Sequence, residues 1–218
     1  MRELRAGLGG FGIFIACIAL GVSVITGINS LADALLDGFA AQGRQLLGGD
    51  VALRRIHQRA NAEEGALFEH LGRVSETATM RSMARLANGS DQTLVEIKAV
   101  DKAYPLLGKL ELAGNRNVDA ALRWTNGAAV AQSLLDRLNL KVGDTIKLGR
   151  ASVPITGVIT NEPDKISARI SFGPRIIVSH ETLAETGLVQ PGTLINWRYA
   201  IAAPGGEHAP IATVLELR

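Results

Sequence analysis

The side chains that most often hold metal ions or perform catalysis are few in this sequence and lie far apart. The single cysteine, Cys17, stands in an apolar run, and one cysteine excludes an intrachain disulfide. The four histidines share no helical or hairpin spacing that would bring two ligands together, as a zinc site requires: His57, His70, His180 and His208. We therefore predict no metal site and no bound cofactor, with histidines that are solvated or partly packed.

Nucleotide-binding and nucleophile motifs are absent from the sequence. A phosphate-binding loop needs Gly, four residues, then Gly-Lys-Ser/Thr, but the pair Gly43 and Gly48 is followed by Gly49-Asp50, whose carboxylate would repel phosphate. The nearest approach to a nucleophile elbow, Gly21-Val22-Ser23, lacks the last glycine and lies in the apolar run. We predict no catalytic residues and no ATPase activity, so the chain is not expected to be an enzyme.

Three weaker candidates remain among the polar and aromatic residues. Asp144, and Asp164 beside Glu162, could be paired carboxylates, but turn residues next to them explain both positions structurally. Trp124 and Trp197 are more typical of a core than of a ligand platform. A local basic cluster could contact a lipid head group or a partner, although a solvated strand end explains it better: Arg54, Arg55, His57 and Arg59.

Composition limits the class of protein. The 218 residues allow one or two domains, and 47% hydrophobic with 20% charged residues is too apolar for intrinsic disorder. A net charge of +2 gives no support to nucleic-acid binding.

An uncharged run from Ala6 to Ala32 predicts a transmembrane helix. Within it, Leu8–Ile28 would span about 31 Å as a helix, close to the thickness of a bilayer core. A cleaved signal peptide ending at Ser30-Leu31-Ala32 is the alternative. An anchor is favoured because the run exceeds a normal signal core and the helical pattern continues past the proposed cut, as a stalk to residue 48.

The residues around and within this run predict its orientation and a packing face. Arg2 and Arg5 precede it, whereas Asp33 and Asp37 follow it, so the N-terminus is expected in the cytoplasm and the remainder outside the inner membrane. Small residues at helical spacing would let another helix approach closely: Gly12, Ala16, Ala19, Ser23 and Gly27. The alternative is that such residues are simply common in membrane helices.

Residues 49–218 read as an α+β domain, with a small inserted unit near 110–170. Asn61 and Glu64 predict a capping box for a helix ending at Leu71, and Asn88-Gly89 predicts a hairpin. We expect the even positions Glu96 and Lys98 to face water. The other expected elements are strands at 50–56, 74–86, 93–100, 145–148, 153–160 (an edge strand, because of Pro154), 175–178 and 195–201, and helices at 128–138, 179–187 and 209–218.

Seven short stretches together resemble a known family of permeases. They are Arg2-Glu3-Leu4-Arg5, Leu46-Leu47-Gly48-Gly49-Asp50-Val51, Val100-Asp101-Lys102-Ala103-Tyr104-Pro105 with Gly108, Leu138-Asn139-Leu140-Lys141-Val142-Gly143-Asp144, Glu162-Pro163-Asp164, Phe172-Gly173-Pro174-Arg175 and Trp197-Arg198-Tyr199. In this order they resemble the permease subunits of MacB/FtsX/LolC-type ABC transporters. Within that group, the chain is most similar to the large permeases associated with lysophospholipase or arylesterase genes.

This resemblance implies an architecture and partners. It implies a first transmembrane helix and stalk, then a MacB-like extracytoplasmic core domain with two subdomains. ATP would be hydrolysed on a separate ATPase subunit, and the complete permease would export or extract a lipidic or hydrophobic substrate. Family permeases carry at least four spans whereas this chain has one, so we expect an N-terminal fragment that does not transport alone. A self-sufficient, single-pass anchored binding or adaptor protein is the alternative.

Overall fold

The chain forms two compact units, residues 1–43 and residues 44–218. The computed structural model describes Gly12, residues 14–32, Leu35 and residues 48–204, except Asn115, Thr125 and residues 165–172, and only the backbone of residues 123 and 124. Several predicted features lie outside the described residues. These are Arg2, Arg5, Asp33, Asp37, most of the stalk, His208 and the final segment 209–218.

The first unit contains an apolar helix, Phe14–Ala32, with a mean hydropathy of 2.0. Its 19 residues would extend about 28 Å, long enough to cross most of a bilayer core. None of its side chains is buried within the protein. A helix that exposes apolar side chains all round is typical of a membrane span. The chain therefore carries one candidate transmembrane helix among its described residues.

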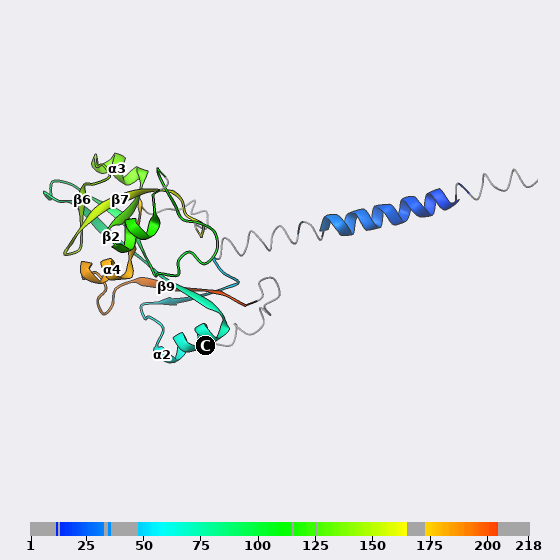
Figure 1. The fold of residues 1–218 in the computed structure, drawn as a ribbon, viewed down its shortest axis with the longest axis horizontal. Helices are drawn as coiled ribbons and strands as arrows, with labels where there is room; N and C mark the ends of the chain where they lie inside the picture. The colour runs from blue at the N-terminus through cyan, green and yellow to red at the C-terminus, as the bar shows by residue number, and fades with distance from the viewer. Residues whose placement is uncertain are drawn as a thin grey trace, which may run out of the picture. The chain divides into compact units, whose positions relative to one another are not determined.

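The second unit is a mixed domain of helices and strands (Figure 1). Its elements in chain order are β1 (Val51–Ile56), α2 (Ala62–Leu71), β2 (Arg73–Leu86), β3 (Gln92–Val100), β4 (Glu111–Leu112), the π-helix η1 (Ala120–Trp124), β5 (Ala128–Ala131), α3 (Gln132–Leu138), β6 (Thr145–Leu148), β7 (Ala151–Asn161), β8 (Arg175–Ser179), α4 (His180–Thr186) and β9 (Ile195–Ala202).

The strands belong to a single sheet with the order β1-β9-β2-β3-β8-β5-β7-β4, in which β6 bridges β2 and β7. Most neighbours are antiparallel, but β3 pairs with β8, and β5 with β7, in parallel. The first strand, β1, pairs with the last, β9. The N–H of Asp50 donates to the Ile201 carbonyl, and the Asp50 carboxylate accepts from the N–H of Ala203. The two ends of the described domain are thus fastened side by side.

Local sequence signals predicted several of these elements correctly. Asn61 and Glu64 form the predicted capping box at the start of α2, each side chain accepting from the backbone N–H of the other. The turn at Asn88-Gly89 joins β2 and β3, which pair antiparallel from Thr77↔Val100 to Arg85↔Gln92. Ser179 caps α4, which ends at Gly187 in the left-handed region.

Two expectations about local structure were wrong in part. The segment predicted as one helix begins with β5, and α3 starts only at Gln132, because Ala128–Val130 are buried in the sheet between β7 and β8. Strand β7 is not an edge strand. Pro154 is nevertheless tolerated, since it pairs with Thr145 of β6 just before the pairing with β5 begins at Ile155.

The predicted insert near 110–170 contains β4 to β7, and these strands are bonded into the same sheet as the rest. A division of the domain into two subdomains stays a prediction. Figure 1 shows α3, β6 and β7 at one end of the domain and α2 at the other.

The two faces of the sheet are covered differently. The main core lies where the three helices pack on the sheet, through Phe68 of α2, Leu134 of α3 and Leu183 of α4. A smaller cluster on the opposite face includes Leu122 and Ile177. Adjacent residues of a strand face opposite sides, so Ile176 and Val178 belong to the main core while Ile177 belongs to the smaller cluster. Next to Ile177 on this second face lies Lys98, its partner in β3.

Candidate functional site

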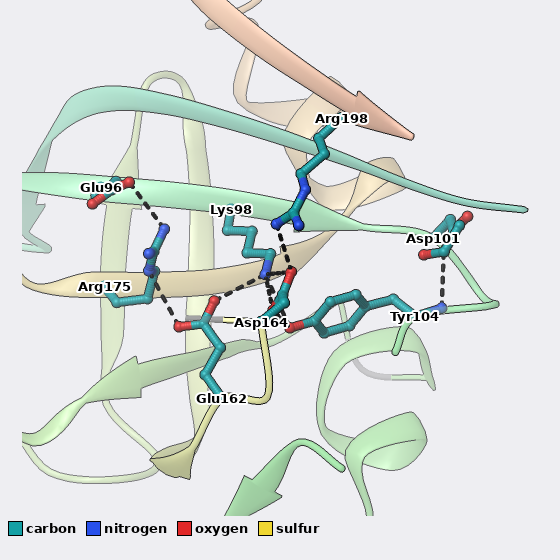
Figure 2. Close-up of polar contacts among 9 residues, drawn as sticks. Glu96, Lys98, Asp101, Tyr104, Glu162, Asp164, Arg175 and Arg198 are labelled. Carbon is teal, nitrogen blue, oxygen red and sulfur yellow. Dashed lines mark hydrogen bonds and ion pairs between the residues drawn. The ribbon is translucent and has the colours of Figure 1, made fainter. Parts of the chain in front are cut away.

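Lys98 is a buried cation in an inner strand of the sheet. It is only 4% exposed, between Thr79 of β2 and Ile177 of β8. Its Nζ lies 2.9 Å from Glu162 Oε1, 2.6 and 2.8 Å from the two carboxylate oxygens of Asp164, and 2.9 Å from the Tyr104 hydroxyl (Figure 2). A buried charge is tolerated only when it is paired and hydrogen-bonded, and these four contacts compensate the ammonium group of Lys98 for its loss of water.

The partners of Lys98 arrive on two segments. Tyr104 follows β3 after a turn held by Asp101, whose Oδ1 accepts from Ser75 Oγ and from the Tyr104 N–H at 2.8 and 2.9 Å. Asp101 Oδ2 accepts from the backbone of the neighbouring strand β2, at Glu76. A carboxylate that bonds to the backbone ahead of it is a common way to fix a turn. Glu162 and Asp164 come directly after the end of β7.

The protonation states in this cluster follow from burial and charge. Burial alone would raise the pKa of Asp164, but the charge and hydrogen bonds of Lys98, with the hydroxyl of Tyr104, hold that pKa below its usual value. Burial, and then the negative charges of Asp164 and Glu162, raise the pKa of Tyr104. At neutral pH Asp164 is therefore ionised and Tyr104 keeps its proton, which it donates to Asp164 Oδ1 at 2.5 Å.

Two arginines extend the cluster outward. Arg175 of β8 lies between two carboxylates, with NH1 3.0 Å from Glu96 and Nε 3.4 Å from Glu162. Arg198 of β9 points toward Asp164 at 3.5 Å (Figure 2). The acidic oxygens are thus engaged by cations from several strands. We name the set the ion cluster: Glu96, Lys98, Tyr104, Glu162, Asp164, Arg175 and Arg198.

The ion cluster has the chemistry of a clamp, since its charged groups pair with one another. It ties β3, β8 and β9 to the segment that follows β7. Within the described residues, no group of three or more His, Cys, Asp or Glu side chains is arranged to hold a metal ion.

An open groove of about 810 Å³ lies over the ion cluster. This volume is within the range of small-molecule sites. Strands β1, β9, β2, β3 and β8 supply most of its lining. We name it the sheet groove; it is lined by Ala52, Leu53, Arg54, Thr77, Thr79, Met80, Arg81, Glu96, Lys98, Glu162, Asp164, Arg175, Thr193, Leu194, Asn196 and Arg198.

The residues of the predicted basic cluster do not act together. Arg54 lines the sheet groove and donates to Asn196 Oδ1 at 2.8 Å. Arg55 pairs with Glu64, whereas Arg59 pairs with Glu76 and lies over the Trp197 ring, 5.5 Å from its centroid. His57 Nδ1 lies 3.1 Å from the Thr193 carbonyl.

The other residues considered in the sequence occupy positions that the fold explains. Asp144 accepts from the N–H of Lys141, as its turn position predicted. Trp197 is buried in the main core, as expected, and stacks on His180 with ring centroids 5.9 Å apart. His70 lies in the last turn of α2. The side chain of Trp124 is outside the described residues.

The expectation that Lys98 faces water was wrong, and the partnership of Glu162 and Asp164 with it was missed. Alternation places Lys98 on the less apolar face of β3, but it does not reveal that a segment 64 to 66 positions away covers that face. The one available signal was that Glu162 and Asp164 occur together directly after a long apolar strand.

The comparisons with known proteins agree with this architecture. The profile of the MacB-like periplasmic core domain matches residues 11–211. The chain is 30% identical over 182 residues to a protein of Escherichia coli (strain K12) described as "Uncharacterized ABC transporter permease YbbP". The match covers 84% of this chain and 22% of that protein, so the chain spans about a fifth of the relative's length.

Two solved structures are among the matches. The extracellular domain of the ABC-type transporter YknZ, from Gram-positive bacteria, is 14% identical with a TM-score of 0.47, over 65% of this chain and 73% of that one. The periplasmic region of MacB from Actinobacillus actinomycetemcomitans is 11% identical with a TM-score of 0.45, over 72% and 78%. The profile match extends from the apolar helix through the whole described domain, and the chain belongs to the family of proteins with a MacB-like periplasmic core domain.

Proposed function

We propose that this chain forms a membrane-anchored, extracytoplasmic part of an ABC transporter permease. The carrying observation is the family match over residues 11–211, which includes both the candidate transmembrane helix and the domain. The 30% identity to a permease over 84% of the chain supports it. In this role the chain is a non-catalytic component, and ATP is hydrolysed on a partner subunit in the cytoplasm.

The finer proposal concerns substrate and topology. The transported molecule is lipidic or hydrophobic, and movement passes from the ATPase through the first helix and stalk to the outer domain. The N-terminus is cytoplasmic and the domain periplasmic, in the inner membrane, as Arg2 and Arg5 before the uncharged run favour. The pairing of β1 with β9 supports this arrangement, since adjacent ends suit a domain inserted between consecutive membrane helices.

Co-expression with candidate ATP-binding cassette proteins tests the partner. The protein that contains this chain should co-purify with one such ATPase in detergent and raise its rate of ATP hydrolysis. If neighbouring DNA encodes neither further spans nor an ATPase, the permease proposal is wrong and a self-sufficient anchored binding protein takes its place.

Cysteine labelling tests the topology. Ser90 is exposed in the β2–β3 turn, so a Ser90→Cys variant in a Cys17→Ser background carries one thiol in the domain. A membrane-impermeant maleimide should label it in intact spheroplasts as fully as in lysed cells. Labelling only after lysis would contradict a periplasmic domain.

A further inference from the structure

The register of the sheet gathers cations on one face. Residues paired across neighbouring strands share a face, as do alternate residues of one strand. Arg54 of β1 lies opposite Arg198 of β9. Two residue positions further along β9, Asn196 pairs with Thr79, which pairs with Lys98. In the next row, Glu96 lies between its strand partners, Arg81 of β2 and Arg175 of β8.

The sheet groove that these rows line has an excess of positive charge. Five of its lining residues are cationic (Arg54, Arg81, Lys98, Arg175 and Arg198) and three are acidic (Glu96, Glu162 and Asp164), which leaves two positive charges. The acids are already engaged inside the ion cluster. Added negative charge is therefore electrostatically favoured in this groove.

Arg54 and Arg198 show the excess most directly. Like charges directly opposite each other on neighbouring strands destabilise a sheet. Arg198 is drawn toward Asp164, while Arg54 donates to the neutral amide of Asn196. Because an anion between the two guanidinium groups would offset their repulsion, this pair marks where a ligand would be held.

The rest of the groove adds further polar groups and an apolar rim. The polar residues Thr77, Thr79 and Asn196 belong to its lining. At the rim, Leu194 is 65% exposed. A polar, cationic floor beside an exposed leucine suits a ligand that joins an oxyanion to an apolar part.

We propose that the sheet groove binds a phosphate-type oxyanion, held chiefly by Arg54, Arg81 and Arg198. The ion cluster beneath it keeps Arg198 and Arg175 in place. Its carboxylates are already paired, Glu162 and Asp164 with Lys98 and Glu96 with Arg175. The oxyanion can come from a lipid head group or from a free anion. Binding requires neither ATP nor a partner subunit, so this proposal and the permease proposal can fail separately.

Calorimetric titration of the full chain in a non-ionic detergent tests the site. The probes are dihexanoyl phosphatidate, inorganic phosphate and, as the zwitterionic comparison, dihexanoyl phosphatidylcholine. We expect phosphatidate to bind more tightly than phosphatidylcholine, and its affinity to fall as ionic strength rises. Binding of phosphatidate alone would identify a lipid head group as the source, whereas equal binding of inorganic phosphate would identify a free anion.

Charge-removing variants locate the binding. Arg54→Gln and Arg81→Gln both alter exposed side chains, so the fold should be kept, and each should weaken phosphatidate binding roughly fivefold or more. Arg73→Gln removes the same charge from an exposed position of β2 outside the groove and should change the affinity less than about twofold. Arg54→Lys, which keeps the positive charge, should retain most of the wild-type affinity for phosphatidate. The proposal is overturned if neither anion binds, or if the groove variants bind as Arg73→Gln does.

Discussion

Lys98 shows how much a single buried charge depends on its partners. Its ammonium is shielded from water in an inner strand, and two carboxylates and a phenol supply what water would otherwise provide. Replacing the whole set by apolar groups could be neutral, but removing one member leaves an uncompensated charge in the interior. The residues of the ion cluster should therefore behave as one energetic unit.

The first prediction concerns this coupling. Lys98→Met should lower the free energy of unfolding by roughly 3–5 kcal/mol, because Glu162 and Asp164 then lose their buried cation. Adding Asp164→Asn to Lys98→Met should recover part of that loss, although Asp164→Asn is destabilising alone. Chemical denaturation followed by tryptophan fluorescence measures all three variants. The coupling would be contradicted if the double variant lost as much stability as the sum of the losses in Lys98→Met and Asp164→Asn.

The second prediction concerns acid. The folded-state pKa of Asp164 lies below the ordinary 3.8. The ionised carboxylate therefore contributes fully to the free energy of unfolding above about pH 3.8, and this contribution is lost as the pH falls through the lowered pKa. Stability should decline below about pH 4 more steeply in the wild type than in Asp164→Asn. Asp136→Asn, at an exposed position of α3, should keep the wild-type slope. Identical slopes for all three proteins would rule out Asp164 as a cause.

At the scale of elements, glycines mark where backbones approach closely. A Cβ on Gly49, just before β1, would lie 2.8 Å from the carbonyl oxygen of Ile201 in β9. Gly65, inside α2, has open space around the same position. The same substitution should therefore have opposite effects at the two sites.

Gly49→Ala should destabilise the domain by roughly 1–3 kcal/mol, since β1 and β9 must separate slightly to admit the methyl group. Gly65→Ala should stabilise it by about 0.5–1 kcal/mol, because alanine has less backbone freedom to lose in a helix. Thermal unfolding of the two variants measures both signs. A stabilising Gly49→Ala would show that the two strands are not held at this contact.

The same scale shows what sequence could predict. The Asn61 cap and the Asn88-Gly89 hairpin were predicted because each depends on residues within a few positions of one another. The helix predicted from Ala128 failed at its start because burial between β7 and β8 outweighed the helical tendency of alanine. The ion cluster could not be predicted, since Lys98 meets Glu162 and Asp164 only after the sheet has formed.

At the scale of the whole molecule, the last prediction concerns how the apolar helix packs against other helices in the membrane. Its small residues Ala16, Ala19, Ser23 and Gly27 recur every three or four positions, whereas Gly21 lies on the opposite side by helical geometry. Both glycines have open space around them within the chain. If another membrane helix packs against the small residues, a larger side chain at Gly27 will disturb that contact and one at Gly21 will not.

Gly27→Leu should weaken association with other membrane helices by roughly 1 kcal/mol or more, because the larger side chain keeps the backbones apart. Gly21→Leu, a matched change off the stripe, should leave association unchanged. A reporter assay for helix association in bacterial membranes measures both. Equal effects would mean that the small residues reflect composition alone.

The pairing of β1 with β9 also decides how the domain would respond to a mechanical load. Val51 at the start of β1 lies opposite Ile201 at the end of β9, so the two connections leave from the same end of this antiparallel pair. Tension applied between them would open the ladder one hydrogen bond at a time, beginning at the contacts of Asp50 with Ile201 and Ala203. A ladder that unzips yields at far lower force than one sheared along its length, so this seam would give way first and leave the ion cluster intact.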